Sequence, residues 1–249
     1  GQIISMEKRQ IVADKHRISA DELTQLQFEL DNAYPQEILK WAHDYYGDKL
    51  VVVTSFQITG IVTLHMLREI TDNVQVMTLD TGLLFPETYQ LIDDVEAALD
   101  ISVQRIKPEL SLPQQAREHG SLLWETNSDK CCHIRKTVPL RESLKNYDAW
   151  VTGLRRDQSI TRRNIPVVDW DDRYDMLKLM PFATWTEDMM WTYINAYELP
   201  YNPLHDRGYP SIGCYTCTMA GNGREGRWSN SGKTECGIHV PLVSEEKVS

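Results

Sequence analysis

Residues 50–67 read LVVVTSFQITGIVTLHML, and this stretch decides the fold. Leu50–Thr54 is a short run rich in β-branched residues, which is typical of a parallel strand buried on both faces. A polar turn follows at Ser55–Gly60, and apolar residues recur at helical spacing from Ile61 onward. The stretch therefore predicts a strand, a short turn and a helix.

The same order of elements returns further along the chain. Val74–Leu79 predicts a second strand, which ends in Asp80-Thr81-Gly82, and Pro86 suits the first turn of the helix that follows. Ile101–Ile106 and Ala149–Thr152 predict further strands. Strands that alternate with helices through short turns predict an α/β fold with a mainly parallel sheet flanked by helices.

Three polar turns come directly after predicted strands, at residues 55–60, 80–82 and 153–163. In open α/β sheets, ligands bind beyond the carboxyl ends of the strands. The positions of these turns therefore predict one shared binding site.

The sequence pattern divides the chain into three parts. Residues 1–48 are expected to be an N-terminal helical segment, in which Ser19-Ala-Asp-Glu22 is a capping box. Residues 49–220 hold the predicted α/β domain. Residues 221–249 begin in a glycine-rich stretch and are expected to form a mobile C-terminal segment.

Composition excludes several classes of protein. The chain has 249 residues with 26 basic and 36 acidic side chains, so its net charge is −10. A surface of this sign argues against general nucleic-acid binding, which needs basic residues to neutralise phosphates. No apolar run approaches the ~20 residues of a membrane-spanning helix, and residues 1–9 contain no apolar signal-like stretch. We therefore expect a soluble cytoplasmic protein that does not bind membranes.

The five cysteines are the most informative residues. Cys131 and Cys132 are adjacent, Cys214 and Cys217 form a C-x-x-C, and Cys236 lies apart from them. An odd number of cysteines without a secretory signal argues against a disulfide framework. The two pairs are compatible with an iron–sulfur cluster, a structural zinc ion, or inert or redox-active thiols.

Two segments carry unexpected positive charge. Residues 153–163 contain four arginines and one aspartate, and guanidinium groups suit bidentate contacts with phosphate or sulfate. The alternative is a solvated basic loop paired with nearby aspartates. Arg224 and Arg227 lie in a glycine-rich stretch, which predicts either a close approach to a ligand or a flexible linker with exposed charges.

Two further residues are candidates because of their spacing from cysteines. Lys136 follows Cys132 by four residues and would share its face of a helix, where a cation could offset thiolate charge and reach a substrate. The alternative is an exposed surface lysine. His239 follows Cys236 by three residues and could bind a phosphate group or lower the pKa of that thiol.

Four motifs together resemble the assimilatory sulfonucleotide reductases. They are Ser55-Phe56, Leu79-Asp-Thr-Gly82 with Phe85-Pro-Glu-Thr88, Thr152-Gly-Leu-Arg-Arg-Asp-Gln-Ser159, and Lys233-Thr-Glu-Cys-Gly-Ile-His239. The Cys-Cys pair with the C-x-x-C is similar to the iron–sulfur branch of that family, the adenylylsulfate (APS) reductases. The resemblance covers about Leu50 to His239 and implies an adenine nucleotide α-hydrolase-like (PP-loop) fold.

The resemblance also implies roles for individual residues. Four cysteines would hold a 4Fe-4S cluster: Cys131, Cys132, Cys214 and Cys217. Cys236 would be the catalytic nucleophile, and the family binds the nucleotide at the positions of Ser55, Leu79, Thr81 and Gly153. It binds phosphate and sulfate at the positions of Lys136, Arg162, Arg224 and Arg227, with Arg163 beside Arg162 as the alternative, and His239 matches the histidine that follows the catalytic cysteine.

The implied reaction is the thiol-dependent reduction of APS to sulfite and AMP through an S-sulfonate on the cysteine. Thioredoxin or glutaredoxin would be the reductant, because Cys236 has no free thiol partner if the other cysteines bind metal. Gln57-Ile-Thr-Gly60 is nearer to the phosphoadenylylsulfate (PAPS) reductases, so a PAPS or dual APS/PAPS reductase is the alternative. A nucleotide-transferring PP-loop enzyme and a zinc-stabilised binding module are more distant alternatives, and the sequence allows a homo-oligomer.

Overall fold

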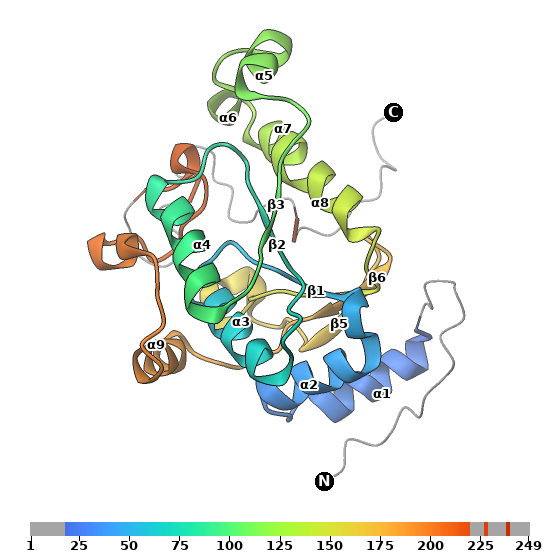
Figure 1. Ribbon diagram of the computed structural model, residues 1–249. Coiled ribbons are helices and arrows are strands. Elements are labelled where there is room, and N and C mark those ends of the chain that lie inside the picture. The colour runs from blue at the N-terminus through green and yellow to red at the C-terminus, as the bar shows by residue number, and fades with distance from the viewer. Residues whose placement is uncertain (1–17, 220–226, 229–237, 240–249) are drawn as a thin grey trace.

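A sheet forms the centre of the computed structural model, which describes residues 18–219, 227–228 and 238–239 (Figure 1). Within these residues the sheet has six strands in the order β3-β2-β1-β4-β6-β5. The strands are β1 (Leu50–Val53), β2 (Val76–Leu79), β3 (Gln104–Ile106), β4 (Ala149–Val151), β5 (Val168–Asp171) and β6 (Met176–Leu179).

Helices connect and flank the strands. The α-helices are α1 (Ala20–Leu30), α2 (Pro35–Tyr46), α3 (Ile58–Ile70), α4 (Pro86–Leu99), α5 (Leu112–His119), α6 (Leu123–Thr126), α7 (Ser128–Cys132), α8 (Val138–Leu144) and α9 (Glu187–Ala196). Shorter helical turns are η1 (Gly47–Lys49), η2 (His133–Thr137, of π type), η3 (Arg156–Gln158), η4 (Ile160–Arg162), η5 (Pro203–Arg207) and η6 (Tyr215–Cys217). None of the helices in the described part of the chain is long and apolar enough to cross a membrane.

The pairing of the strands is mainly parallel, as the alternating pattern predicted. β1 pairs in parallel with β2 and β4, β2 with β3, and β4 with β6. β5 alone among the described strands runs antiparallel, because a turn at residues 172–175 joins it directly to β6. The mixed, mostly parallel α/β fold is thus confirmed.

Successive residues of a strand face opposite sides of the sheet, and each side has its own core. Val52 and Val151 face a large core that also contains buried residues of α1, α2, α3, α4 and α9. Val51 and Trp150 face a smaller core with α8 and, from the C-terminal segment, Ile238. Since α1 and α2 belong to the larger core, the N-terminal helices and the sheet are packed as one body, and the domain boundaries at 48 and 220 stay a prediction.

The sequence pattern missed two strands and set others too long. β5 and β6 lie in VDWDDRYDMLKL, where four acidic residues hide the apolar alternation. Val74–Leu79 and Ile101–Ile106 shorten to β2 and β3, because hydrogen-bonded pairing to the neighbouring strand starts only at Val76 and Gln104.

Candidate active site

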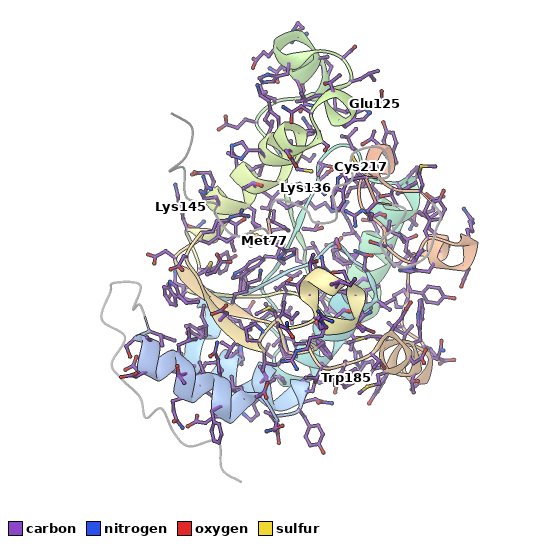
Figure 2. The ribbon with its side chains drawn as sticks, turned by 180° about the vertical axis from the view of Figure 1, so that it is seen from behind. Met77, Glu125, Lys136, Lys145, Trp185 and Cys217 are labelled. Atoms are coloured by element: carbon purple, nitrogen blue, oxygen red, sulfur yellow. The ribbon has the colours of Figure 1, made fainter. Side chains whose placement is uncertain are left out.

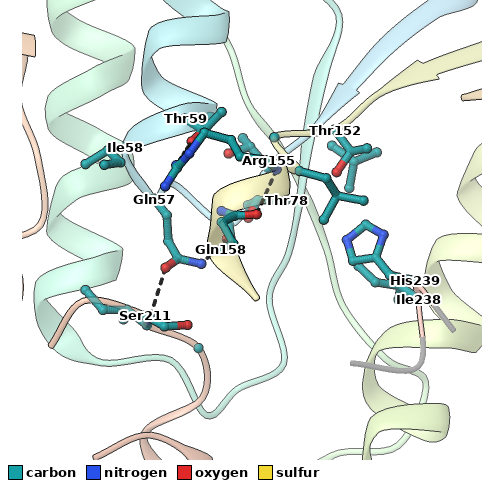
Figure 3. Close-up of a pocket in the computed structure, with 18 of the residues that line it drawn as sticks. Gln57, Ile58, Thr59, Thr78, Thr152, Arg155, Gln158, Ser211, Ile238 and His239 are labelled. Carbon is teal, nitrogen blue, oxygen red and sulfur yellow. Dashed lines mark hydrogen bonds between the residues drawn. The ribbon is translucent and has the colours of Figure 1, made fainter. Parts of the chain in front are cut away.

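A pocket lies at the carboxyl edge of the sheet, at the ends of β1, β2 and β4 (Figure 3). Thr54 and Ser55 line it after β1, Leu79 lines it from the end of β2, and Gly153 lines it after β4. Segments far apart in the sequence are therefore brought to one edge, which is where ligands of open α/β sheets bind.

Most of the predicted substrate-binding residues meet in this pocket. Seven of the nine candidates line it: Ser55, Leu79, Lys136, Gly153, Arg162, Arg227 and His239. Thr81 lies elsewhere, since its hydroxyl is 3.2 Å from the Sγ of Cys214. Arg224 and Cys236 lie outside the residues that the structure describes. The proximity of the seven is a finding, whereas their binding roles stay predictions.

The turn between β1 and α3 has an unusual backbone. Phe56 is buried and has φ = 60°, a left-handed conformation that costs a non-glycine residue on the order of 1–3 kcal/mol. The amide of Phe56 donates to the hydroxyl of Thr54 at 3.0 Å, which holds the turn. Gln57 then donates to Ser55 and accepts from the amide of Ile212, so it joins the turn to the segment that precedes the C-x-x-C (Figure 3).

Position 60 requires glycine because there is no room for a Cβ atom next to Thr54. A Cβ at position 60 would stand 1.9 Å from the Thr54 hydroxyl oxygen, which already accepts the bond from Phe56. We expect Gly60→Ala to lower the free energy of unfolding by roughly 1–3 kcal/mol, because displacing Thr54 leaves the buried Phe56 amide unsatisfied. Urea unfolding measures the change.

The control for this prediction is the Thr54→Ala background, where the clashing oxygen is absent. There, Gly60→Ala should cost less than in the wild-type chain, and a double-mutant cycle gives the difference. Equal costs in the two backgrounds would contradict the proposed clash.

Two of the four arginines in residues 153–163 are used within the fold. Arg155 is buried, forms an ion pair with Asp157 at 2.9 Å and donates to the hydroxyl of Thr59. Arg156 donates to the carbonyl of Ile165 at 2.8 Å. The bond of Arg155 holds the loop after β4 against the start of α3, and the bond of Arg156 holds it to residue 165. Both guanidinium groups therefore have partners within the fold, which limits the predicted anion-binding run to the remaining arginines.

Arg162 also lines the pocket, and it is more buried than the neighbouring Arg163. It is 7 % exposed and donates to the side chain of Gln158, whereas Arg163 is exposed. Arg227 also lines the pocket and donates to the Ser211 hydroxyl at 3.0 Å. Two guanidinium groups held in this way present a preorganised positive site.

The predicted metal-binding cysteines come together beside the pocket. Cys131 and Cys214 are buried in one apolar cluster with Leu83, and Cys217 packs against it. The adjacent Cys132 is also buried. Pairs that are 82 residues apart in sequence are therefore neighbours, and all four described cysteines are thiols.

Polar side chains surround the cysteine cluster. Thr81 contacts the Sγ of Cys214, and the amide nitrogen of Gln115 lies 3.8 Å from the Sγ of Cys131. The buried guanidinium of Arg135 donates to the carbonyl of Thr81 and to the side chain of Gln115. One cation thus supports the contacts made to both cysteine segments, an arrangement that the sequence spacing did not indicate.

Burial raises the pKa of the Cys131 thiol, and the nearby charge of Cys214 raises it further. Burial likewise raises the pKa of Cys217, while Lys136 opposes that shift. Lys136, labelled with Cys217 in Figure 2, also lines the pocket, so one lysine acts electrostatically on the cysteine cluster and faces the pocket. A surface lysine without a site is therefore the weaker interpretation.

The four described cysteines do not have the geometry of a single-ion site. Among the described residues, no group of three or more histidine, cysteine, aspartate or glutamate side chains is placed to hold one ion. Zinc requires thiolates that converge on one tetrahedral point. An iron–sulfur cluster distributes its thiolates over several irons. Of the four described cysteines, Cys131, Cys132 and Cys214 are buried and Cys217 is half-buried.

Three residues of the site escaped the sequence analysis: Gln57, Arg155 and Gln115. Gln57 and Arg155 belong to segments that the sequence analysis identified as candidates. Nothing in the sequence distinguished side chains that support the fold from side chains that face a ligand. Gln115 is 16 residues from its sulfur partner, on another helix, and gave no signal.

Comparisons with known proteins agree with this geometry. Residues 49–220 match the phosphoadenosine phosphosulfate reductase domain. An adenosine 5'-phosphosulfate reductase of Salinibacter ruber is 44 % identical over 233 residues, covering 92 % of each chain. A protein of Bacillus subtilis, adenosine 5'-phosphosulfate reductase 2, is 45 % identical over 208 residues, covering 82 % of this chain and 88 % of its own.

Solved structures give the same result. A PAPS reductase of Candida auris, solved with phosphate, is 32 % identical with a TM-score of 0.73, covering 81 % of this chain and 98 % of its own. The FMN adenylyltransferase of Candida glabrata has a TM-score of 0.57 at 13 % identity, covers 86 % of this chain and 70 % of its own, and shows the fold alone. By sequence and by fold, the chain belongs to the phosphoadenosine phosphosulfate reductase family, with adenosine 5'-phosphosulfate reductases among its relatives.

Proposed function

We propose that this protein reduces APS to sulfite and AMP, as the names of its relatives indicate. The observation that carries the proposal is the meeting of Arg162, Arg227 and Lys136 in one pocket at the carboxyl edge of the sheet. Although the net charge of the chain is −10, these basic side chains lie together where a phosphosulfate would bind.

The nucleotide would lie along the turns after β1 and β4. Ser55 and the backbone at Gly153 face the pocket, and Leu79 adds an apolar contact. An added Cβ at Gly153 would stand 3.1 Å from Thr59, so the loop after β4 lies against the start of α3 and leaves the pocket open. The cations would then neutralise the substrate's anionic groups, which would otherwise repel an attacking thiolate.

The first chemical step falls to Cys236. Its thiolate attacks the sulfur of the phosphosulfate, a bond forms between Sγ and that sulfur, and the bond from sulfur to the bridging oxygen breaks. AMP leaves with the electron pair, and the enzyme carries an S-sulfonate. The support for this step is the E-C-G-I-H motif, whose Ile238 and His239 reach the pocket.

The second step needs an external dithiol. One thiolate attacks Sγ of Cys236, and sulfite leaves with the electron pair of the sulfur–sulfur bond. The second thiol then resolves the mixed disulfide, so the dithiol loses two electrons and the substrate gains them. Thioredoxin or glutaredoxin supplies that chemistry, and both operate in the reducing cytoplasm, where we place the protein.

A 4Fe-4S cluster is proposed as the cofactor of the cysteine cluster. Its ligands would be Cys131, Cys132, Cys214 and Cys217. When bound, it would tie the two cysteine segments together and place a fixed charge beside Lys136. The support is the apolar cluster that contains Cys131, Cys214 and Cys217, with the buried Cys132 adjacent to Cys131 in sequence. Thr81 and Gln115 lie near sulfur atoms of this cluster.

PAPS is the second candidate substrate, because the PAPS reductase of Candida auris shares this fold at 32 % identity. Both nucleotides contain the same phosphosulfate and differ in the 3'-phosphate. We propose APS because the relatives named APS reductases have the higher sequence identity to this chain, 44 % and 45 %.

Turnover with each nucleotide tests the proposal. Anaerobically purified protein with thioredoxin and its reductase should release sulfite and AMP from APS, with kcat/KM for APS exceeding that for PAPS by about tenfold or more. Mass spectrometry without reductant should find one SO3 adduct on Cys236. A preference for PAPS would replace APS as the substrate, and no sulfite from either nucleotide would contradict the proposal.

A further inference from the structure

Two described residues of the C-terminal segment, Ile238 and His239, contact the sheet near the pocket. Ile238 packs against the smaller core. The ring of His239 is parallel to the ring of Trp150, with an interplanar angle of 7° and a centroid distance of 5.9 Å. Both residues line the pocket (Figure 3). His239 is thus seated on β4 and faces the candidate substrate site.

Lys178 holds the same histidine from β6. Its Nζ lies 3.0 Å from Nδ1 of His239 and 4.8 Å from the centroid of the Trp150 ring. Lys178 is absent from the lining of the pocket among the residues that the structure describes, so it meets the histidine without facing a ligand there. None of the motifs in the sequence pointed to this lysine.

Acidic and aromatic groups lie next to Lys178. Asp169 is its direct partner across the antiparallel pair of β5 and β6, and Asp171 is on the same strand. Burial raises the pKa of both carboxyl groups, and Lys178 opposes the shift in each. The face of the Trp150 ring adds a cation–π contact.

The contact fixes the protonation state of the histidine ring. A lysine ammonium group has three donors and no acceptor. Nδ1 of His239 must therefore accept, which leaves the ring proton on Nε2. A neutral histidine of this tautomer offers Nε2–H as a donor to an anionic group.

We propose that Lys178 is a positioning residue that seats His239 as its Nε2–H tautomer, so that this nitrogen donates to the phosphosulfate in the pocket. The inference rests on the proposed function for the identity of the anion. Its structural part, the tautomer set by Lys178, does not depend on turnover.

The first test is nitrogen NMR of protein labelled with 15N-histidine. His239→Gln identifies the signal of His239 among the seven histidines of the chain. We expect the Nε2–H tautomer in the wild-type protein and a mixture of tautomers in Lys178→Met, which keeps the aliphatic chain but removes the donor. Lys178→Arg should restore the wild-type state. An Nδ1–H tautomer in the wild type would overturn the proposal, and that result needs only His239→Gln to fold, not a variant at Lys178.

The second test is steady-state kinetics with APS. Losing one donor to an anion should raise KM about tenfold in Lys178→Met with little change in kcat, and Lys178→Arg should recover most of the loss. Lys145→Met is the matched control, because that exposed lysine pairs with Glu142 on α8. An unchanged KM in Lys178→Met would overturn the inference, whereas absence of turnover in the wild type would instead contradict the proposed function.

Discussion

Replacing Cys236 with serine is expected to abolish the release of sulfite, with a loss in kcat of about 10⁴-fold or more. A thiolate is the nucleophile that attacks the sulfur of the phosphosulfate, and a serine hydroxyl is not ionised at neutral pH and has no base assigned to it here. The SO3 adduct should also be absent from the mass spectrum of the protein mixed with APS. Sulfite production and the adduct are measured on the same preparation.

The control for this substitution is Ser231→Ala, which lies in the same segment and is expected to keep wild-type turnover. Cys236→Ser should still bind APS, because the cations of the pocket are intact. Retained sulfite release, or an SO3 adduct on another cysteine, would contradict the assignment of the nucleophile. The same variant separates the enzyme from a zinc-stabilised binding module, for which the change would have no consequence.

Replacing Cys214 with serine is expected to remove the iron. Anaerobically purified wild-type protein should contain about four irons and four acid-labile sulfides per chain, and the variant fewer than about one of each. Cys214 is 6 % exposed and belongs to the cluster with Cys131, so the loss of one ligand leaves the others in an apolar site without compensation. Because metal binding is coupled to folding, the melting temperature should fall as well.

The matched control is Cys236→Ser, which should retain all of its iron and lose only turnover. The two variants therefore separate cysteines that hold the cofactor from the one that attacks. Zinc in place of iron in the wild-type protein would support the structural-zinc alternative. Full iron content in Cys214→Ser would contradict the proposed ligand set.

The strands with a clearly apolar composition could be predicted from the sequence, whereas β5 and β6, which lie in an acidic stretch, could not. β1 is buried along its whole length, so its residues had to be apolar on both faces. β5 and β6 carry Asp169, Asp171 and Lys178 toward the smaller core, where cross-strand pairing makes buried charge tolerable. Such pairing is invisible before the register is known, because each charge by itself argues against a strand.

The spacing of residues within one motif identified candidate site residues. The spacing between motifs did not show which of these residues contact one another. The four cysteines were recognised as one set, and the structure brings Cys131, Cys214 and Cys217 together, with the buried Cys132 next to Cys131 in sequence. Thr81 was predicted to bind the nucleotide, and the structure places its hydroxyl 3.2 Å from the Sγ of Cys214, so its binding role stays a prediction. The choice between Arg162 and Arg163 required burial, since both are identical in chemistry.

By itself, the sequence determined the parallel α/β architecture and which kinds of side chain the site contains. Apolar periodicity and motif chemistry are local properties, so they can be read from the sequence alone. The tertiary structure alone decided which arginines support the loop and which face the pocket, and that Lys178 meets His239 across 61 residues. Those contacts depend on strand register and burial, which arise only when distant segments pack against one another.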